Sequence, residues 1–375
     1  MRPFKALFLI LLLLNSFNSS LFDFILFNKM NKEKSGENLI VSPLSIYQVL
    51  SLTANGAKGV TQKEMIEVLR ENIENLNENN YEILKTFNRF STLEIANAVM
   101  TKFTPLEDFC AIADKYSAPI EPLESLEQVN KWCNDKTHGK IPKILETLSP
   151  DTVMLLLNAI YFKGEWESQF DAKFTKNLTF YNFGIEQKNV ETMEQLEHFY
   201  YYEDKKVQII SLPFKEDLMS AIIILPNEKM DINTYINYLP LSHDEINTVL
   251  SQLERKKVHL QLPKFEVEFS DELNQILIDL GMYDAFSPKD ADFSGLREEG
   301  GLYISKVIHK TYLKVNENGT EAAGVTVVEV EETAIYDEDS KIYDMKINRP
   351  FLFLLKNNLL PEEHNLVFMA KIEKI

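Results

Sequence analysis

The chain has 375 residues, which exceeds the usual size of one domain and allows a large buried core. Its 57 acidic residues outnumber its 39 basic residues, and the formal net charge is −18. A chain this acidic is a poor candidate for binding nucleic acid or an anionic membrane. Glycine and proline are scattered, and no internal repeat or low-complexity block appears, so we expect one large domain.

The first 20 residues have the layout of a secretory signal peptide. Arg2 and Lys5 precede an apolar run from Ala6 to Leu14, and small polar residues follow. The run is too short for a membrane-spanning helix. We expect residues 1–20 to be a signal peptide and residues 21–375 to be a secreted, extracellular domain. An N-terminal anchor or a buried first helix is the alternative.

Helix starts are marked by side chains that can accept hydrogen bonds from free backbone N–H groups. Ser42 followed by Pro43 predicts one helix N-terminus. Capping-box spacing predicts four more, and these pairs are Thr61 and Glu64, Thr104 and Glu107, Ser125 and Gln128, and Ser242 and Glu245. The N-terminal third is therefore predicted to be mostly helical. Cys110 and Cys133 lie in predicted helices, and we expect two separate buried thiols although a secretory route permits a disulfide.

Apolar runs later in the chain predict strands. Residues 153–162 are almost continuously apolar, which is typical of a strand buried on both faces. Residues 207–214 and 219–225 are joined by three charged residues and predict a hairpin. Further strands are predicted at 258–262, 303–308, 312–315, 351–355 and 366–372. Helices followed by strands indicate an α+β fold with large mixed or antiparallel sheets.

The stretch 317–345 begins as a strand and continues as an acidic loop. One face of the strand is small or apolar, with Thr320, Ala322, Gly324, Thr326, Val328 and Val330. The opposite face is half charged, and the sequence YDEDSK at 336–341 is typical of an exposed loop. The pattern fits a sheet-edge strand that leads into a surface loop, or a strand that has not yet joined its sheet.

Motifs for catalysis and metal binding are absent from the sequence. It contains no G-x-S-x-G, H-E-x-x-H, P-loop or G-x-G-x-x-G pattern. The six histidines have no metal-ligand spacing, and the segment that starts at Asp290 has Gly301 where a calcium loop requires glutamate. We expect no enzyme activity, no metal and no cofactor.

Ten segments resemble, in the correct order, the motifs of the serpins, the large serine-protease-inhibitor family. They are NLIVSPLSI (38–46), GAKG (56–59), THGKI (137–141), LNAIYFKGEW (157–166), LPK (262–264), ADFSG (291–295), SKVIHK (305–310), VNENGTEAA (315–323), RPFLF (349–353) and LVFM (366–369). The resemblance covers the chain from about residue 21 to its end. It implies the serpin fold, a single α+β domain with helices packed on mixed and antiparallel sheets and an exposed reactive-centre loop at about 317–345.

The resemblance also implies a mechanism. A serpin offers its loop as bait to a protease, and after cleavage and acyl-enzyme formation the N-terminal part of the loop inserts into the central sheet as a new strand. The protein would then be a monomeric suicide-substrate inhibitor that forms a covalent complex with a serine protease of the chymotrypsin fold. The hinge of the loop would comprise Glu317, Gly319, Thr320, Ala322, Ala323, Gly324 and Thr326.

Two further groups of residues take their expected roles from the resemblance. Ser42, Ser45, Asn158 and His309 match the polar cluster beneath the point where the sheet opens. Trp166, Lys264 and Glu317 match an aromatic residue and an ion pair at the breach, the top of the sheet where insertion begins.

The position of the cleaved bond follows from counting. The residue before the scissile bond is expected 14 positions after Gly319, which places the bond between Thr333 and Ala334 and suits an elastase-like pocket. The loop is longer than the family norm, so Tyr336 for a chymotrypsin-like protease and Lys341 for a trypsin-like protease stay open. The acidic loop favours a target with a basic surface around its cleft, or is simply solvated.

Other functions stay possible at this point. A non-inhibitory serpin that acts as a carrier or chaperone is the main alternative, and inhibition of a papain-like cysteine protease is another, because the trap needs only a covalent acyl intermediate. The segment between Arg70 and Ser91 is short and acidic, so no heparin binding is expected. Of two glycosylation sequons, we expect the one at Asn177 to be used and the one at Asn318, in the hinge, to be unused.

Overall fold

The central sheet is built around β4 (Met154–Phe162), in a computed structural model that describes residues 20–87, 93–237, 243–320 and 341–375. Leu155 and Leu157 pack on one face of β4, and Leu156 and Ile160 belong to the main core on the other face. This alternation explains why the strand is apolar at nearly every position. The strand predicted at 153–162 is thus present, with both faces buried.

A seven-stranded sheet surrounds β4 in the order β3-β2-β4-β12-β13-β5, with β11 paired to β12. β4 is antiparallel to β2 and parallel to β12. The other members of this sheet are β2 (Leu93–Thr101), β3 (Ile120–Pro122), β5 (Gly164–Glu165), β11 (Phe265–Glu272), β12 (Lys306–Asn316) and β13 (Gly319–Thr320). On its side away from β11, β12 contacts β4 along most of its length and β13 at its end.

A nine-stranded sheet has the order β1-β16-β15-β9-β8-β7-β10-β14, with β6 paired to β7. β14 (Tyr343–Lys346) ends this order and is parallel to β10. The remaining strands are β1 (Leu39–Val41), β6 (Lys176–Asn182), β7 (Glu186–Glu203), β8 (Val207–Pro213), β9 (Met219–Pro226), β10 (Glu254–Pro263), β15 (Phe351–Asn357) and β16 (Leu366–Ile372). The predicted hairpin is confirmed, because β8 and β9 are antiparallel neighbours.

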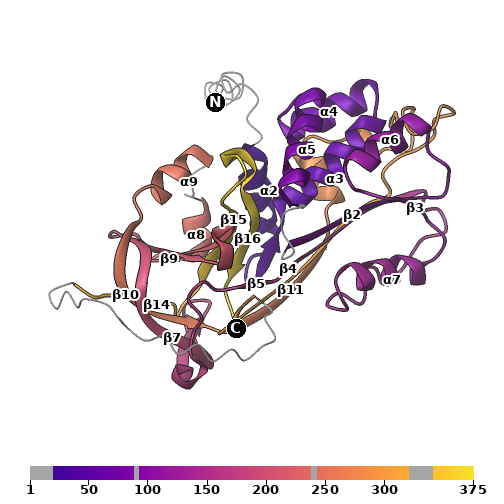
Figure 1. Ribbon diagram of the computed structural model, residues 1–375. Coiled ribbons are helices and arrows are strands. Elements are labelled where there is room, and N and C mark those ends of the chain that lie inside the picture. The colour runs from indigo at the N-terminus through magenta and orange to yellow at the C-terminus, as the bar shows by residue number, and fades with distance from the viewer. Residues whose placement is uncertain (1–19, 88–92, 238–242, 321–340) are drawn as a thin grey trace, which may run out of the picture.

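Helices cover both faces of the central sheet. Figure 1 shows α3, α4, α5 and α6 above β2 and α7 below it. The helices are α2 (Ser20–Glu33), α3 (Pro43–Gly56), α4 (Gly59–Leu69), α5 (Ile73–Phe87), α6 (Glu107–Lys115), α7 (Leu126–Lys136), α8 (Ile232–Asn237), α9 (His243–Leu250) and α10 (Asn274–Leu280). Short 3-10 turns are η1 (Ala172–Phe174), η2 (Lys215–Asp217), η3 (Asp284–Phe286) and η4 (Glu362–His364). No helix in the described ranges is long and apolar enough to cross a membrane.

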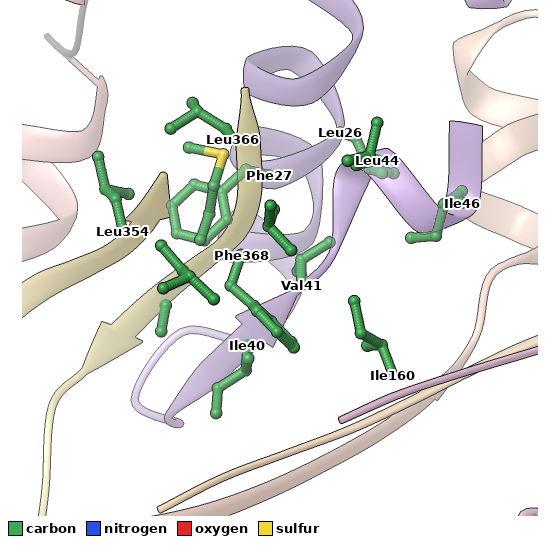
Figure 2. Close-up of a cluster of buried hydrophobic side chains, with 14 of the residues drawn as sticks. Leu26, Phe27, Ile40, Val41, Leu44, Ile46, Ile160, Leu354, Leu366 and Phe368 are labelled. Carbon is green, nitrogen blue, oxygen red and sulfur yellow. The ribbon is translucent and has the colours of Figure 1, made fainter. Parts of the chain in front are cut away.

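The main core joins the two sheets through the first helices and the last strands. Figure 2 shows Phe27 from α2, Val41 from β1 and Phe368 from β16 meeting above β4, with Ile160 of β4 pointing toward them. All four side chains are fully buried. The two ends of the described chain are therefore packed into one cluster, and this makes the α+β arrangement a single domain.

Only some of the predicted helix caps are correct. Ser42 accepts from the Ser45 N–H at 3.4 Å with Pro43 in the first turn, and Ser125 accepts from the Gln128 N–H. The starts predicted at Thr61 and Thr104 are wrong, because α4 begins at Gly59 and α6 at Glu107. Ser242 lies outside the described residues.

The predicted strands were incomplete. Residues 303–308 and 312–315, predicted as two strands, belong largely to the single strand β12. Strands β2, β6, β7 and β11 were not predicted. Cys110 and Cys133 are both free thiols, as predicted, but Cys110 is only half-buried. Burial raises the pKa of the Cys133 thiol to about 12, so this cysteine is an inert core residue.

Candidate functional site

The first part of the site is the seam where β4 and β12 run in parallel, from Leu155–Tyr161 against Lys306–Tyr312. His309 on β12 lies directly opposite Asn158 on β4, which in turn lies opposite Asn97 on β2. All three side chains are buried, and His309 is completely so. A polar row therefore crosses three strands at the middle of an otherwise apolar sheet, where every polar group needs a partner.

Hydrogen bonds tie this row to the start of α3. The Ser42 backbone N–H donates to His309 Nε2 at 3.1 Å, so Nε2 carries no proton and the neutral ring is protonated on Nδ1. Nδ1 then donates to Asn158 Oδ1 at 2.6 Å, which also accepts from Ser45 Oγ at 2.8 Å. The seam is thus held by hydrogen bonds between neutral groups.

Charge is excluded from the seam. Burial lowers the pKa of His309 to about 3, because an imidazolium there would lose its hydration and Nε2 is already an acceptor. Asn158 Nδ2 donates to Asn97 Oδ1 at 2.6 Å, which extends the network toward Gln48 on α3. The four residues predicted for this cluster are therefore in one hydrogen-bonded group.

The second part of the site is the start of the loop. Gly319 and Thr320 form β13, which lies between β12 and β5 and is antiparallel to both. Thr320 is fully buried, and its Oγ1 accepts from the Gly164 N–H at 2.9 Å. The first residues of the predicted strand are thus already members of the central sheet.

Gly319 is required at its position for two reasons. Its φ is +140°, in the region that side-chain-bearing residues rarely adopt. A Cβ atom placed there would lie 1.9 Å from the Gly164 carbonyl oxygen, which is inside any permitted contact distance. The close approach of two backbones therefore explains a glycine at the base of the loop.

Trp166 fixes the chain just before Gly319. Its indole N–H donates to the Asn316 carbonyl at 3.0 Å, and its backbone N–H donates to the Asn318 carbonyl at 2.9 Å. The ring is buried and stacks on Phe214 with centroids 4.4 Å apart. Trp166 thus links the end of β12 to the nine-stranded sheet.

Glu317 and Lys264 form an ion pair beside this tryptophan, with a separation of 3.3 Å. Partial burial acts to raise the pKa of the Glu317 carboxyl, but hydrogen bonds from its own backbone N–H and from Thr175, together with the charge of Lys264, lower it below the ordinary value. Thr175 Oγ1 donates to Glu317 Oε1 at 2.8 Å. The carboxylate is therefore held in its ionised form at the top of the sheet.

The other predicted site residues are placed as follows. Lys341 is exposed, lies 3.8 Å from Glu203, and stands 4.0 Å from the centre of the Tyr343 ring. Asn177 is an exposed residue of β6. Ala322, Ala323, Gly324, Thr326, Thr333, Ala334 and Tyr336 lie outside the described residues.

Several residues of the site were missed in the sequence. Asn97 and Gln48 extend the seam network, Thr175 holds Glu317, and Phe214 supports Trp166. Asn97 alone left a signal, as a polar residue inside the apolar run of β2. The partners Thr175 and Phe214 come from distant segments and gave no local pattern.

The described residues of the seam and the hinge differ from those of a catalytic or metal site. In the described residues of the seam and of the hinge, no nucleophile is paired with a base. Among the described residues, no group of three or more histidine, cysteine, aspartate or glutamate side chains is placed to hold a metal ion. The site consists of a seam between two parallel strands and the short strand β13, which lies between β12 and β5.

Comparison with known proteins agrees with this architecture. The family model described as "Serpin (serine protease inhibitor)" matches residues 18–375. A leukocyte elastase inhibitor of Xenopus laevis is 35% identical over 358 residues, covering 90% of this chain and 94% of that protein. Serpin B8 of Homo sapiens is 34% identical, covering 89% of this chain and 92% of that protein.

Solved structures give the same result. The thermophilic serpin tengpin in its native state superimposes with a TM-score of 0.86 at 33% identity, covering 96% of this chain and 94% of that one. Thyroxine-binding globulin in complex with thyroxine superimposes with a TM-score of 0.85 at 25% identity, covering 96% and 98%. With its sheet topology, its hinge and these matches, the chain belongs to the serpin (serine protease inhibitor) family.

Proposed function

We propose that the protein inhibits a serine-type endopeptidase as a suicide substrate. The protease cleaves a bond within the loop that follows Gly319, and the acyl-enzyme is trapped. The part of the loop that begins at Thr320 then inserts between β4 and β12. The observation that carries the proposal is β13, because the first two residues of the inserting strand already lie between β12 and β5.

The direction of the strands supports the proposal. β13 is antiparallel to β12 and to β5, and β5 follows β4 in the same strand direction. A strand that continues β13 down the seam would replace one parallel pair by two antiparallel pairs, which are slightly more stable per residue. Insertion therefore extends pairing that exists already.

The loop sequence supports insertion as well. The face that would enter the sheet consists of Thr320 and the small or apolar residues at alternate positions up to Val330. A charge on this face would carry a desolvation cost, and the sequence has none there. Each new ladder hydrogen bond adds roughly 0.5–1.5 kcal/mol, so about ten of them reach the scale of the 5–15 kcal/mol that stabilises a typical domain.

The scissile bond is proposed between Thr333 and Ala334. A small Thr suits a narrow elastase-like pocket, and the relative from Xenopus laevis bears the name leukocyte elastase inhibitor. Lys341 is a weaker candidate, since it lies two residues before β14 and contacts Tyr343 and Glu203. Tyr336 is retained as the candidate for a chymotrypsin-like protease.

Secretion belongs to the same proposal. It rests on the sequence of residues 1–20, and the exposure of Asn177 in β6 is compatible with a glycan at that sequon. We further propose that the protein acts as a monomer. It is also proposed to act without heparin, because the segment 70–91 contains four acidic residues, Glu71, Glu74, Glu78 and Glu82, and only three basic residues, Arg70, Lys85 and Arg89.

The test is incubation with elastase-, chymotrypsin- and trypsin-like proteases, followed by denaturing gels and mass spectrometry of the released C-terminal peptide. We expect an SDS-resistant complex and a peptide that begins at Ala334. Thr326→Arg and Val327→Arg form a matched pair, since they add the same charge to the inward and outward faces of the strand. The Val327 variant should still form the complex, whereas the Thr326 variant should be cleaved without trapping the protease. Clean cleavage of the wild type without any complex would overturn inhibition in favour of a carrier.

A further inference from the structure

The C-terminal base of the loop is attached to the molecule through β14, an edge strand of four residues. β14 pairs with β10 alone among the described strands. Its inner face is packed, because Met345 is fully buried and the Tyr343 ring lies 5.4 Å from the Tyr201 ring. Its outer face carries Asp344, whose side chain is 63% exposed. An edge strand this short depends on its side-chain contacts to stay in place.

The outer face of β14 is tied to the sheet by His259 of β10. His259 Nδ1 lies 2.8 Å from Asp344 Oδ1, and Nε2 lies 3.1 Å from Glu194 Oε1 on β7. One imidazole ring therefore spans carboxylates on the two strands that flank β10. The two nitrogens point to different carboxylates, so this group is a hydrogen-bonded bridge.

The protonation state of His259 decides how many carboxylates it can bind. An imidazolium donates from both nitrogens, whereas a neutral ring has one N–H and presents a lone pair to the second carboxylate. The hydrogen bond to Asp344 raises the pKa of His259 above its ordinary value, partial burial opposes this shift, and Glu194 adds to it. The charged form is therefore the one that fits the site.

The surrounding charges are few and can be named. Glu194 also binds Lys176 of β6 at 3.3 Å and the Gln261 amide of β10 at 3.3 Å, both through Oε2. Lys257 and Lys346 lie two residues from His259 and Asp344 on the same strand faces, and the titratable His198 of β7 lies opposite Lys257. These lysines oppose the charge on His259, while the two carboxylates contact its ring directly and favour it.

We infer that His259 is a positioning residue that fixes the C-terminal base of the reactive loop through Asp344 and releases it as the ring loses its proton. The inference rests on the proposed function, because a loop that inserts from Thr320 needs its C-terminal end to be fixed at β14 until the loop is cut. With His259 protonated, β14 is bound to β10 and, through the ring, to β7. A neutral His259 has one N–H for two carboxylates, so the hydrogen bond to Asp344 or the hydrogen bond to Glu194 is lost. The strand β14 then opens more often.

The sign of the pH effect follows from the raised pKa. A group whose pKa is raised by folding contributes its stabilisation fully below the unfolded value, and this contribution is lost as the pH rises through the folded value. The strand β14 should therefore be more firmly held at pH 5.5 than at pH 8.0. Proteins are generally destabilised at low pH, whereas β14 should be held more firmly there. The two effects have opposite signs and can therefore be distinguished.

The test is amide hydrogen exchange of the peptide 343–347 in the full, uncleaved chain, corrected for the intrinsic pH dependence of exchange. We expect about three- to tenfold faster opening at pH 8.0 than at pH 5.5 in the wild type. His259→Gln and Asp344→Ala should open fast at both pH values. His198→Gln is the matched control, because that histidine is exposed on the neighbouring strand and pairs with the adjacent Glu197.

Glu194→Gln separates this account from a merely structural role of the ring. A neutral His259 can donate to Asp344 from Nδ1 and accept from the new amide at Nε2, so this variant should stay protected at both pH values. Equal protection of the wild type at both pH values, a pH response that survives in His259→Gln, or a Glu194→Gln variant as open as His259→Gln would overturn the inference. Amide exchange needs no protease, so a failure to trap proteases would count against the proposed function alone.

Discussion

The seam between β4 and β12 and the anchor of β14 each depend on a histidine, yet their environments are opposite. His309 is fully buried and neutral, and it contacts an amide oxygen and a backbone N–H. His259 is partly exposed and bridges two carboxylates. Burial lowers the pKa of the first and carboxylates raise that of the second, so acid weakens the seam and strengthens the anchor.

The difference shows that the seam, in the seven-stranded sheet, and the anchor of β14, in the nine-stranded sheet, are stabilised by different kinds of hydrogen bond. Under the proposed insertion, the seam stays closed until a strand enters, and neutral hydrogen bonds can be broken there without leaving a buried charge. The anchor lies at the surface, where an ionised bridge is tolerated because solvent reaches its edges. Four substitutions or conditions test this contrast.

Asn158→Ala should have the largest effect, because it breaks the seam. The change removes the acceptor of His309 and Ser45 and the donor to Asn97, and it leaves buried polar groups unsatisfied. We expect a loss of about 3–5 kcal/mol in the free energy of unfolding, measured by chemical denaturation. A loss below about 1 kcal/mol would show that the cluster does not hold the seam.

Acidification should act on the same cluster through His309. Its folded pKa is depressed, so its contribution is complete above the unfolded value near 6.5 and is lost as the pH falls toward about 3. Between pH 7 and pH 5 this amounts to roughly 2 kcal/mol. His309→Gln should show a correspondingly flatter dependence of unfolding free energy on pH, and identical slopes would contradict a neutral buried histidine.

Gly319→Ala tests the upper end of the seam. The added Cβ would collide with the Gly164 carbonyl, so β13 should leave the sheet at a cost of about 2 kcal/mol. Gly36→Ala is the matched control, since Gly36 also has a positive φ but no atom lies within 4 Å of its Cβ position. Exchange of the Thr320 amide should rise in the first variant only; equal behaviour of the two would exclude a steric role.

Glu317→Gln should have the smallest effect. The ion pair with Lys264 is partly exposed, with 15% of the Glu317 side chain and 29% of the Lys264 side chain accessible, and the amide can still accept from Thr175. We expect a loss of about 1 kcal/mol or less, which should diminish in high salt. A loss several times larger and insensitive to salt would mean that the carboxylate supports the hinge in another way.

Some of this organisation could be read from the sequence. The continuous apolar run of β4 and the cap at Ser42 predicted the central strand and the start of α3. The strand pattern that begins at Thr320 is present as β13 as far as the described residues reach. These features are local, since each is decided by neighbours in the chain.

The errors have physical reasons. β12 was divided into two strands because His309, Lys310 and Thr311 interrupt its apolar pattern, and His309 and Thr311 are fully buried polar residues of the seam. The spacing of Thr61 and Glu64 looks like a capping box, but these side chains accept from the distant backbone N–H groups of Asp292 and Asp284. The bridge at His259 joins three strands and has no signal in any one of them.

The measurement that tests the central claim most directly is the thermal unfolding midpoint before and after the loop is cut within 331–343 by a protease that is not trapped. If the loop inserts along the β4–β12 seam, about ten new ladder hydrogen bonds should raise the midpoint by about 10 °C or more. Amide exchange of β4 and β12 should slow in parallel. An unchanged or lower midpoint would contradict insertion and leave the loop as an ordinary exposed substrate.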